Sequence, residues 1–527
     1  MKEKADFDIE ARLSQQLLIG EILARNAFKF PDLEAFVLGG NRLSYNALDM
    51  RVNRLANALL AQGIAQGEKI GILMRNRQEL LEIFFAAAKI GAVNVPINIR
   101  LSPSEIAYIV ENSDTKILFM EEAFVPAIEK ILDQLDHVEA IFLVGGSDHP
   151  ACKSYDRFVA DVGSDQPRIY VADEDEAFII YTAGTTGKPK GALLTHKNMV
   201  CNALEVAHAM SLSQPRSLNL PPANPKSLVV APLFHVAGIM NILRTMLQLT
   251  TVVLKDFDPV QILQTLESEQ ITYLFLVPAM WRILLDHPEF EKYDKRTLRS
   301  AGYGADIMPN SLKERILEAF PNASLFEAFG QTEMSATAIF MPHQDALRKE
   351  GSVGLPLRMA SIRVVDDEMN DVATGQVGEI VYRGPTLFKG YYNHPEETDK
   401  AFEGGWFHSG DLVKQDEEGF VYIIDRKKDM ILSGGENVYS AEVEEVLQEC
   451  PKIKEAVIVG VPDPKWGQAV KAFVVLRENE EATRDEIMDF CRERLARYKC
   501  PKHIDFIDAL PRSATGKVLK RLLRDTQ

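Results

Sequence analysis

A loop dense in small and hydroxyl-bearing residues follows an apolar, strand-like run at residues 177–181. The ten residues after the run, 182–191, read TAGTTGKPKG. Backbone N–H groups and hydroxyls at such density suit phosphate oxygens, and Lys188 and Lys190 add positive charge. The pattern is not a Walker loop, because Thr182 and Pro189 replace its first glycine and its Ser or Thr. The composition favours phosphate binding over a flexible glycine loop without a ligand.

Further short segments combine glycine with carboxylates, lysines or an aromatic ring. They are residues 328–333 (AFGQTE), 406–411 (WFHSGD), 425–429 (DRKKD), 433–437 (SGGEN) and 511–517 (PRSATGK). Carboxylates accept hydrogen bonds from hydroxyl groups and ligate hard cations such as Mg²⁺. Lys517 directly follows Gly516 and comes six residues after Pro511, so it is expected to lie in a loop. These side chains therefore suit chemistry on a nucleotide.

In this order the segments resemble the motifs of the acyl-adenylate-forming superfamily. That superfamily contains the acyl-CoA synthetases, peptide-synthetase adenylation domains and firefly luciferase. The resemblance spans nearly the whole chain and is closest to fatty or aryl acyl-CoA synthetases. It implies that ATP and a carboxylic acid form an acyl-adenylate and pyrophosphate, and that CoA then displaces AMP.

The resemblance assigns the phosphates, the metal and the adenosine to different motifs. It implies that Thr332 binds the α-phosphate and that Glu333 holds Mg²⁺. The residues implied for the leaving phosphates are Thr182, Ala183, Gly184, Thr185, Thr186, Gly187 and Lys190. Those implied for adenine and ribose are Gly304, Ala305, Asp306, Glu327, Ala328, Phe329, Gly330, Asp411 and Arg426. Phe329 stands where many relatives have tyrosine, and Asp306 where the family pattern has proline.

The resemblance also implies a catalytic lysine and a moving C-terminal domain. Lys517 would bridge the substrate carboxylate and the α-phosphate. Lys428 occupies the hinge position, about which the C-terminal domain rotates between the two half-reactions. Gly434 and Gly435 would then leave room for pantetheine. His235 matches the gate between the acyl and thiol channels, although a histidine in an apolar run is also compatible with an ordinary core position.

The acid is expected to be hydrophobic. The residues expected near it are Met240, Met280, Tyr303, Gly330 and Met334. They are mostly apolar, and no charged side chain among them would grip an amino acid. A medium- or long-chain fatty acid is the first choice, and an aromatic or alicyclic acid is the alternative. An enzyme that loads a carrier protein stays open, but we expect no fused carrier, because only ten residues follow Lys517. Neither a luciferase-like oxygenase nor an adenylate sensor has positive support.

The amino-acid composition indicates a globular protein and bears on which partners it can bind. The 527 residues are 46% hydrophobic and 26% charged, which is ordinary for globular domains. Asp and Glu total 76 against 59 Lys and Arg, so nucleic-acid binding is not expected. Residues 492–527 are nevertheless basic, with ten Lys or Arg against four acids, which suits a lid that closes on nucleotides.

The cysteines, the N-terminal residues and the apolar runs bear on where in the cell the protein is expected. The five cysteines are scattered and contain no CxxC pair, so we expect a cytoplasmic protein without a zinc site or disulfides. The N-terminal residues are charged and unlike a secretory signal. The apolar run at 228–243 is too short for a membrane span and reads as a strand, a loop and a helix. Peripheral membrane contact and a homodimer are both left open.

The pattern of elements predicts an α/β protein. Helices are expected over 43–62, 79–90 and 261–270, alternating with strands at 69–74, 117–120, 140–144, 228–231, 251–255 and 273–277. Residues 214–225 contain four prolines and predict a loop. Strands at 361–365 and 379–383 indicate a β-rich subdomain.

The C-terminal residues predict a separate small domain. Helix 440–448, strands 456–461 and 472–476, and a helix with a capping box at 483–486 indicate a compact α+β fold. We therefore predict an AMP-binding domain over 1–427 and a mobile lid over 428–527.

Overall fold

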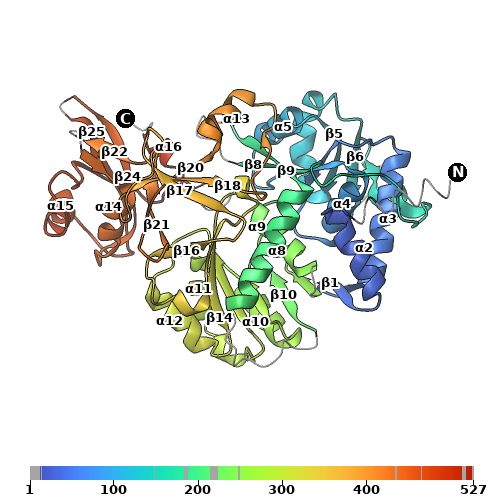
Figure 1. Ribbon diagram of the computed structural model, residues 1–527, viewed down its shortest axis with the longest axis horizontal. Helices are drawn as coiled ribbons and strands as arrows, with labels where there is room; N and C mark the ends of the chain where they lie inside the picture. The colour runs from blue at the N-terminus through green and yellow to red at the C-terminus, as the bar shows by residue number, and fades with distance from the viewer. Residues whose placement is uncertain are drawn as a thin grey trace. The chain divides into compact units, whose positions relative to one another are not determined.

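The computed structural model describes residue 12 and residues 15–146, 149–182, 188–213, 224–246, 250–433, 436–464, 466–512 and 518–524. The chain divides into two compact units (Figure 1). Unit 1 comprises Met1–Ser361 and Tyr382–Phe407, and unit 2 comprises Ile362–Val381 and His408–Gln527. The predicted boundary at 427/428 concerns which residues move together, and it stays a prediction.

One sheet of unit 1 is parallel at its centre and antiparallel at both ends. In spatial order its strands are β16 (Ser352–Pro356), β15 (Ile339–Met341), β14 (Ser324–Phe329), β13 (Ser300–Gly304), β12 (Tyr273–Phe275), β10 (Lys226–Val229), β11 (Thr250–Val253), β1 (Glu34–Leu38) and β2 (Asn41–Ser44). Because β13 and β14 are parallel neighbours, their carboxyl ends lie together at one edge.

The second sheet of unit 1 joins segments that are far apart in the sequence. In spatial order its strands are β19 (Gly390–Tyr391), β9 (Lys190–Thr195), β8 (Glu176–Thr182), β4 (Val93–Pro96), β3 (Lys69–Leu73), β5 (Thr115–Glu121), β6 (Ala140–Val144) and β7 (Lys153–Ser154). The strands from β8 to β7 are parallel, whereas β9 runs antiparallel to both β8 and β19. The sheet thus places β19 beside the end of the predicted phosphate loop.

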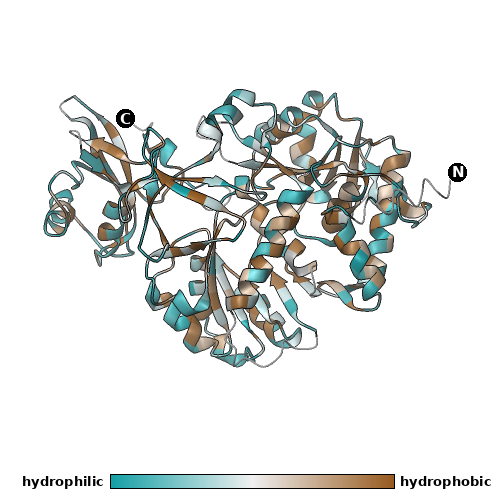
Figure 2. Ribbon diagram, in the orientation of Figure 1, coloured by the Kyte–Doolittle hydropathy of each residue, from teal (hydrophilic) through white to brown (hydrophobic). Residues whose placement is uncertain are grey.

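Helices connect and cover these strands. Those of unit 1 are α2 (Ile19–Lys29), α3 (Tyr45–Ala61), α4 (Gln78–Ile90), α5 (Pro103–Asn112), α6 (Val125–Ile128), α7 (Tyr155–Ala160), α8 (His196–Ser213), α9 (Val236–Met246), α10 (Pro259–Ser268), α11 (Pro278–Leu285), α12 (Asn310–Ala319) and α13 (Pro395–Ala401). Ser44 caps α3 by accepting the Ala47 N–H at 3.2 Å. Figure 2 shows α4 in hydrophobic colours, in keeping with its almost complete burial.

Unit 2 contains a β-rich part and a compact α+β part. Its strands are β17 (Ser361–Val365), β18 (Gly378–Arg383), β20 (Phe407–Gln415) and β21 (Val421–Arg426), followed by β22 (Ile431–Ser433), β23 (Glu436–Val438), β24 (Ile453–Asp463), β25 (Gly467–Leu476) and β26 (His503–Phe506). Helices α14 (Ser440–Gln448), α15 (Arg484–Arg492) and α16 (Lys520–Arg524) accompany them. The predicted capping box is present on α15, where Thr483 and Glu486 bond reciprocally.

These elements confirm the predicted α/β class, with a large mixed-sheet part and a small C-terminal part. The apolar run at 228–243 forms the end of β10, a turn and most of α9, as predicted. No helix in the described ranges combines the length and the apolarity that a bilayer crossing requires. Most of the predicted proline-rich loop at 214–225 lies outside the described residues.

Candidate active site

The two ends of the predicted phosphate loop meet in a β-hairpin. Strands β8 and β9 pair antiparallel with Thr182 opposite Lys190. The Thr182 hydroxyl also donates to the Lys190 carbonyl at 3.5 Å. The hairpin therefore holds both anchors of the loop, whereas Ala183, Gly184, Thr185, Thr186 and Gly187 lie outside the described residues.

Lys190 is surrounded by groups that balance its charge. Its Nζ forms an ion pair with the Glu397 carboxylate of α13 and lies 5.3 Å from the centroid of the Tyr391 ring. The hydrogen bond from Lys190 lowers the pKa of Glu397. The Lys190 side chain is only 11% exposed, so few water molecules can reach its ammonium group.

Glu333 contacts Tyr391, the tyrosine that also lies beside Lys190. The Tyr391 hydroxyl donates to Glu333 Oε1 at 2.8 Å, and both Thr332 and Glu333 are buried. Burial and the Glu333 carboxylate raise the pKa of Tyr391, so its hydroxyl stays a donor at neutral pH. One side chain thus joins the predicted metal ligand to the predicted phosphate lysine. Sequence reasoning missed Tyr391 and Glu397, because their partners lie far away in the chain.

The turn that carries Glu333, η4 (Thr332–Met334), is fixed from several sides. The Phe388 N–H donates to the Glu333 carbonyl at 2.8 Å, and the Ser335 hydroxyl donates to the Thr386 carbonyl at 2.9 Å. Ser335 and Ala336 have φ values of 54° and 85°, in the left-handed region. Strain of this kind is characteristic of functional turns whose surroundings impose the conformation.

The segments predicted to bind adenine lie next to one another. In the register of β13 and β14, Gly304 is opposite Ala328. A Cβ at Gly304 would lie 2.4 Å from the Ala328 carbonyl oxygen, which explains a glycine there. Phe329 and Gly330 follow Ala328, while Ala305 and Asp306 are exposed beyond β13. The structure therefore brings these residues to one edge, and their contact with adenine stays a prediction.

Glu327 is a buried carboxyl group beneath this edge. It lies opposite Tyr303, and Lys313 on α12 donates to the Ala346 carbonyl at 3.0 Å nearby. Burial raises the pKa of Glu327 to about 7, with Lys313 and Tyr303 opposing the shift. Burial also lowers the pKa of Lys313. Glu327 therefore ionises near neutral pH, and its contact with adenine stays a prediction.

His235 precedes α9. Its Nδ1 accepts the Ala237 N–H at 3.3 Å. The residue has solvent access, yet neighbouring atoms crowd the ring, and this desolvation lowers its pKa. The imidazole is therefore neutral at pH 7, which is compatible with a gate and leaves that role a prediction.

Unit 2 contains the residues that are predicted to bind the ribose. Asp411 on β20 is opposite Arg426 on β21, and Arg426 Nε lies 2.8 Å from Asp411 Oδ1. Asp411 is 2% exposed, so the ion pair fixes a carboxylate that has little access to water. Lys428 follows, and burial lowers its pKa. Gly434, Gly435 and Lys517 lie outside the described residues.

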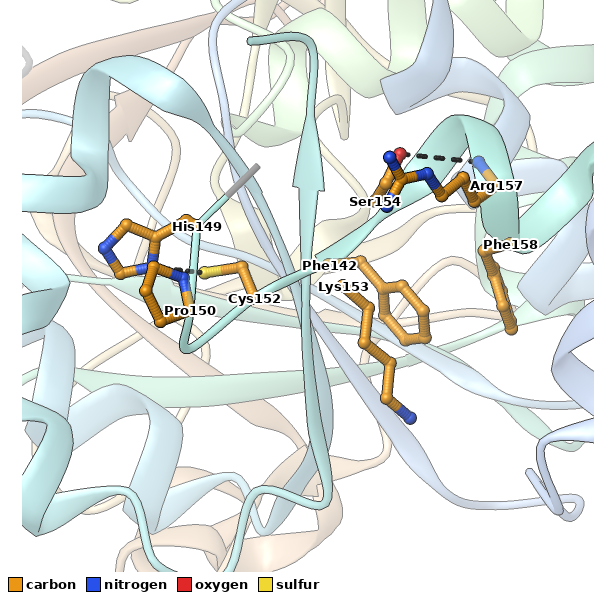
Figure 3. Close-up of a pocket in the computed structure, with 8 residues that line it drawn as sticks. All are labelled: Phe142, His149, Pro150, Cys152, Lys153, Ser154, Arg157 and Phe158. Atoms are coloured by element: carbon orange, nitrogen blue, oxygen red, sulfur yellow. Dashed lines mark hydrogen bonds between the residues drawn. The ribbon is translucent and has the colours of Figure 1, made fainter. Parts of the chain in front are cut away.

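A separate surface hollow of about 650 Å³ lies at the far end of the second sheet. Figure 3 shows Phe142 and Phe158 in its wall, with the Cys152 thiol facing His149. Cys152 Sγ and His149 Nδ1 are 3.5 Å apart. The hollow shares no residue with the motifs, and burial raises the pKa of Cys152, so it does not mark the reaction site.

Comparison with known proteins agrees with this arrangement. The family model for AMP-binding enzymes matches residues 23–392, and that for the AMP-binding enzyme C-terminal domain matches residues 442–517. A feruloyl-CoA synthase from Amycolatopsis sp is 35% identical over 96% of this chain and 98% of its own length. The long-chain-fatty-acid–CoA ligase FadD13 of Mycobacterium tuberculosis is also 35% identical, again over 96% of this chain and 98% of its own.

A solved structure gives the same result. The o-succinylbenzoate coenzyme A synthetase MenE from Bacillus subtilis, in complex with ATP and a magnesium ion, matches with a TM-score of 0.82. It is 28% identical, and the match covers 96% of this chain and 99% of that one. The chain therefore belongs to the family of AMP-binding enzymes, and within it to the acyl-adenylate-forming acid–thiol ligases.

Proposed function

We propose that this protein is an ATP-dependent acyl-CoA synthetase that activates a hydrophobic carboxylic acid through an acyl-adenylate. The observation that carries the proposal is the cluster of Lys190, Tyr391 and Glu333 in unit 1. Transfer of AMP to a carboxylate brings anions together, so it needs fixed positive charge and a held metal ion. The cluster supplies a cation and a carboxylate around one side chain.

The Glu333 carboxylate fits Mg²⁺. Its Oε1 accepts from Tyr391, and among the described residues no hydrogen bond occupies Oε2. Mg²⁺ is commonly bound through one or two carboxylates plus phosphate oxygens and water. The described ranges contain no cluster of three His, Cys, Asp or Glu side chains that could hold a metal ion, in keeping with an ion that binds with the nucleotide. When bound, Mg²⁺ would neutralise phosphate charge.

The other residues would bind and orient the reactants. Thr182 and Lys190 would hold the departing phosphates, and Thr332 the α-phosphate. Asp411, fixed by Arg426, would accept hydrogen bonds from the ribose hydroxyls. Lys517 would stabilise the charge that develops between the carboxylate and the α-phosphate. After rotation about Lys428, CoA would attack the acyl carbon and AMP would leave.

The acid is a medium- or long-chain fatty acid in this proposal, and an aromatic or alicyclic acid is the alternative. Met240, Tyr303 and Met334, all expected near the acid, are buried. An apolar lining gains most from an apolar substrate. All five cysteines are free thiols, which supports a cytoplasmic location.

The test is product analysis over a panel of fatty, benzoic and alicyclic acids, with and without CoA. We expect CoA-dependent formation of AMP and pyrophosphate, fastest with a fatty acid. ADP and phosphate as products would refute the adenylate route. Acyl transfer to a carrier protein but not to CoA would identify the carrier-loading alternative.

A variant separates the two half-reactions. Lys517→Ala should abolish acyl-adenylate formation and keep thioester formation from preformed adenylate. Arg521→Ala, which removes an exposed cation from α16, is the matched control. Equal loss of both half-reactions in Lys517→Ala would contradict the predicted domain rotation.

A further inference from the structure

Tyr391 contacts two side chains that belong to different motifs. Its hydroxyl donates to Glu333 Oε1 at 2.8 Å, and the face of its ring lies 5.3 Å from Lys190 Nζ. Neither contact is needed to hold β19 in the sheet, because backbone pairing of Tyr391 with Ala192 does that. The side chain is therefore available for a purpose other than strand pairing.

Several neighbours hold Tyr391 in place. Its N–H donates to the Thr398 hydroxyl at 2.9 Å, and that hydroxyl donates to the His394 carbonyl at 3.0 Å. The ring packs edge-on against Phe388, with 4.8 Å between the centroids. A hydroxyl held in this way can fix the direction of the Glu333 carboxylate, as outer partners of metal ligands do.

Glu397 occupies the other side of Lys190. Its carboxylate forms an ion pair with Nζ and is 36% exposed, whereas the lysine side chain is 11% exposed. The charge of Lys190 is thus balanced before any phosphate arrives. A phosphate group that binds Lys190 must compete with this carboxylate, which is free to turn towards water.

We propose that Tyr391 and Glu397 are a positioning pair. Tyr391 aims the Glu333 carboxylate at the metal ion, and Glu397 holds Lys190 in place until a phosphate replaces its carboxylate. This inference rests on the proposed function, because it assigns the phosphates and the metal to that site. In this proposal Tyr391 acts through Glu333 and Glu397 acts through Lys190.

The tyrosine is tested by Mn²⁺ binding in the presence of ATP, followed by electron paramagnetic resonance without an acid substrate. Tyr391→Phe keeps the ring and removes only the hydroxyl. We expect Mn²⁺ to bind about tenfold more weakly, the lower end for loss of an outer partner. ATP binding in EDTA should not change.

Tyr392→Phe is the matched control. It removes a hydroxyl one residue away, which donates to Asp114 at 2.7 Å. Binding of Mn²⁺ to Tyr391→Phe with the affinity of the Tyr392→Phe control would overturn the role of Tyr391. Absence of ATP-dependent Mn²⁺ binding in the wild type would instead refute the proposed function itself, so the two failures are distinguishable.

The glutamate is tested by calorimetric titration with inorganic pyrophosphate in EDTA. We expect Glu397→Gln to bind pyrophosphate about fivefold more tightly, because the competing charge is gone, as expected for an ion pair worth at most a modest energy. Glu396→Gln removes the same charge from an exposed neighbour on α13. Equal affinities in the two variants, or weaker binding in Glu397→Gln, would overturn the competition.

Discussion

Replacing Glu327 by glutamine should make the protein more stable at alkaline pH and change its stability less at acidic pH. Burial raises the pKa of this carboxyl group from 4.5 to about 7. Between pH 4.5 and pH 7 the Glu327 carboxyl group is ionised in the unfolded chain but still protonated in the folded chain. The free energy of unfolding therefore falls as pH rises, by about 1.4 kcal/mol per pH unit.

The size of the effect follows from the two pKa values. Stability from the neutral carboxyl group is fully present below pH 4.5 and lost once pH has passed about 7. Between pH 5 and pH 8 the loss amounts to roughly 2 to 3 kcal/mol. Glutamine has nearly the same shape and no titration, so the variant avoids this loss. For a chain of this length the difference corresponds to about 2 °C in melting temperature.

The assay is thermal unfolding of wild type and Glu327→Gln at half-unit steps from pH 5 to pH 8, without ligands. The gap between the two melting temperatures should widen as pH rises. Glu318→Gln, on the exposed side of α12, is the control and should run parallel to wild type. Parallel curves for Glu327→Gln would show that Glu327 does not stay protonated on folding, and would refute the burial argument.

Two further predictions concern unit 2. Thr483→Ala removes the cap of α15 and should lower the stability of the helix by about 1 kcal/mol. Hydrogen exchange over residues 484–492 should become roughly fivefold faster, whereas Thr483→Ser should stay near wild type. Unchanged exchange in Thr483→Ala would contradict the capping role. Asp411→Ala should weaken ATP binding about tenfold and abolish any preference for ATP over 2′,3′-dideoxy-ATP, because a charged acceptor for the ribose is lost. A variant that still prefers ATP would place the ribose elsewhere.

The sequence predicted the class of fold and the order of most elements, and it was less accurate at their ends. The helix predicted over 43–62 begins at Tyr45, because Leu43 and Ser44 belong to β2 and Ser44 serves as the cap. The strand predicted at 456–461 extends over Ile453–Asp463, because β25 pairs along its whole length. Strand ends depend on a partner strand, and local sequence does not contain that information.

In the candidate site, too, the sequence predicted local features and missed contacts between distant segments. Motifs predicted the groups that bear the chemistry, such as Glu333 and Asp411, because each motif is local. They did not predict that Tyr391 would join Glu333 to Lys190, since that contact follows from the pairing of β19 with β9. Nor did they predict the burial of Glu327 on β14, a strand against which α12 packs.

The pairing of β9 with β19 also bears on the order in which the protein is completed during synthesis. Lys190 and Glu397 are 207 residues apart. At ordinary translation speeds the ribosome takes roughly 10 to 40 s to cover that interval. Throughout it the lysine has no Glu397 carboxylate and β9 has one unpaired edge, a state that invites mispairing with other chains. The nascent protein therefore cannot form the Lys190–Glu397 ion pair or the β9–β19 pairing until α13 has been synthesised.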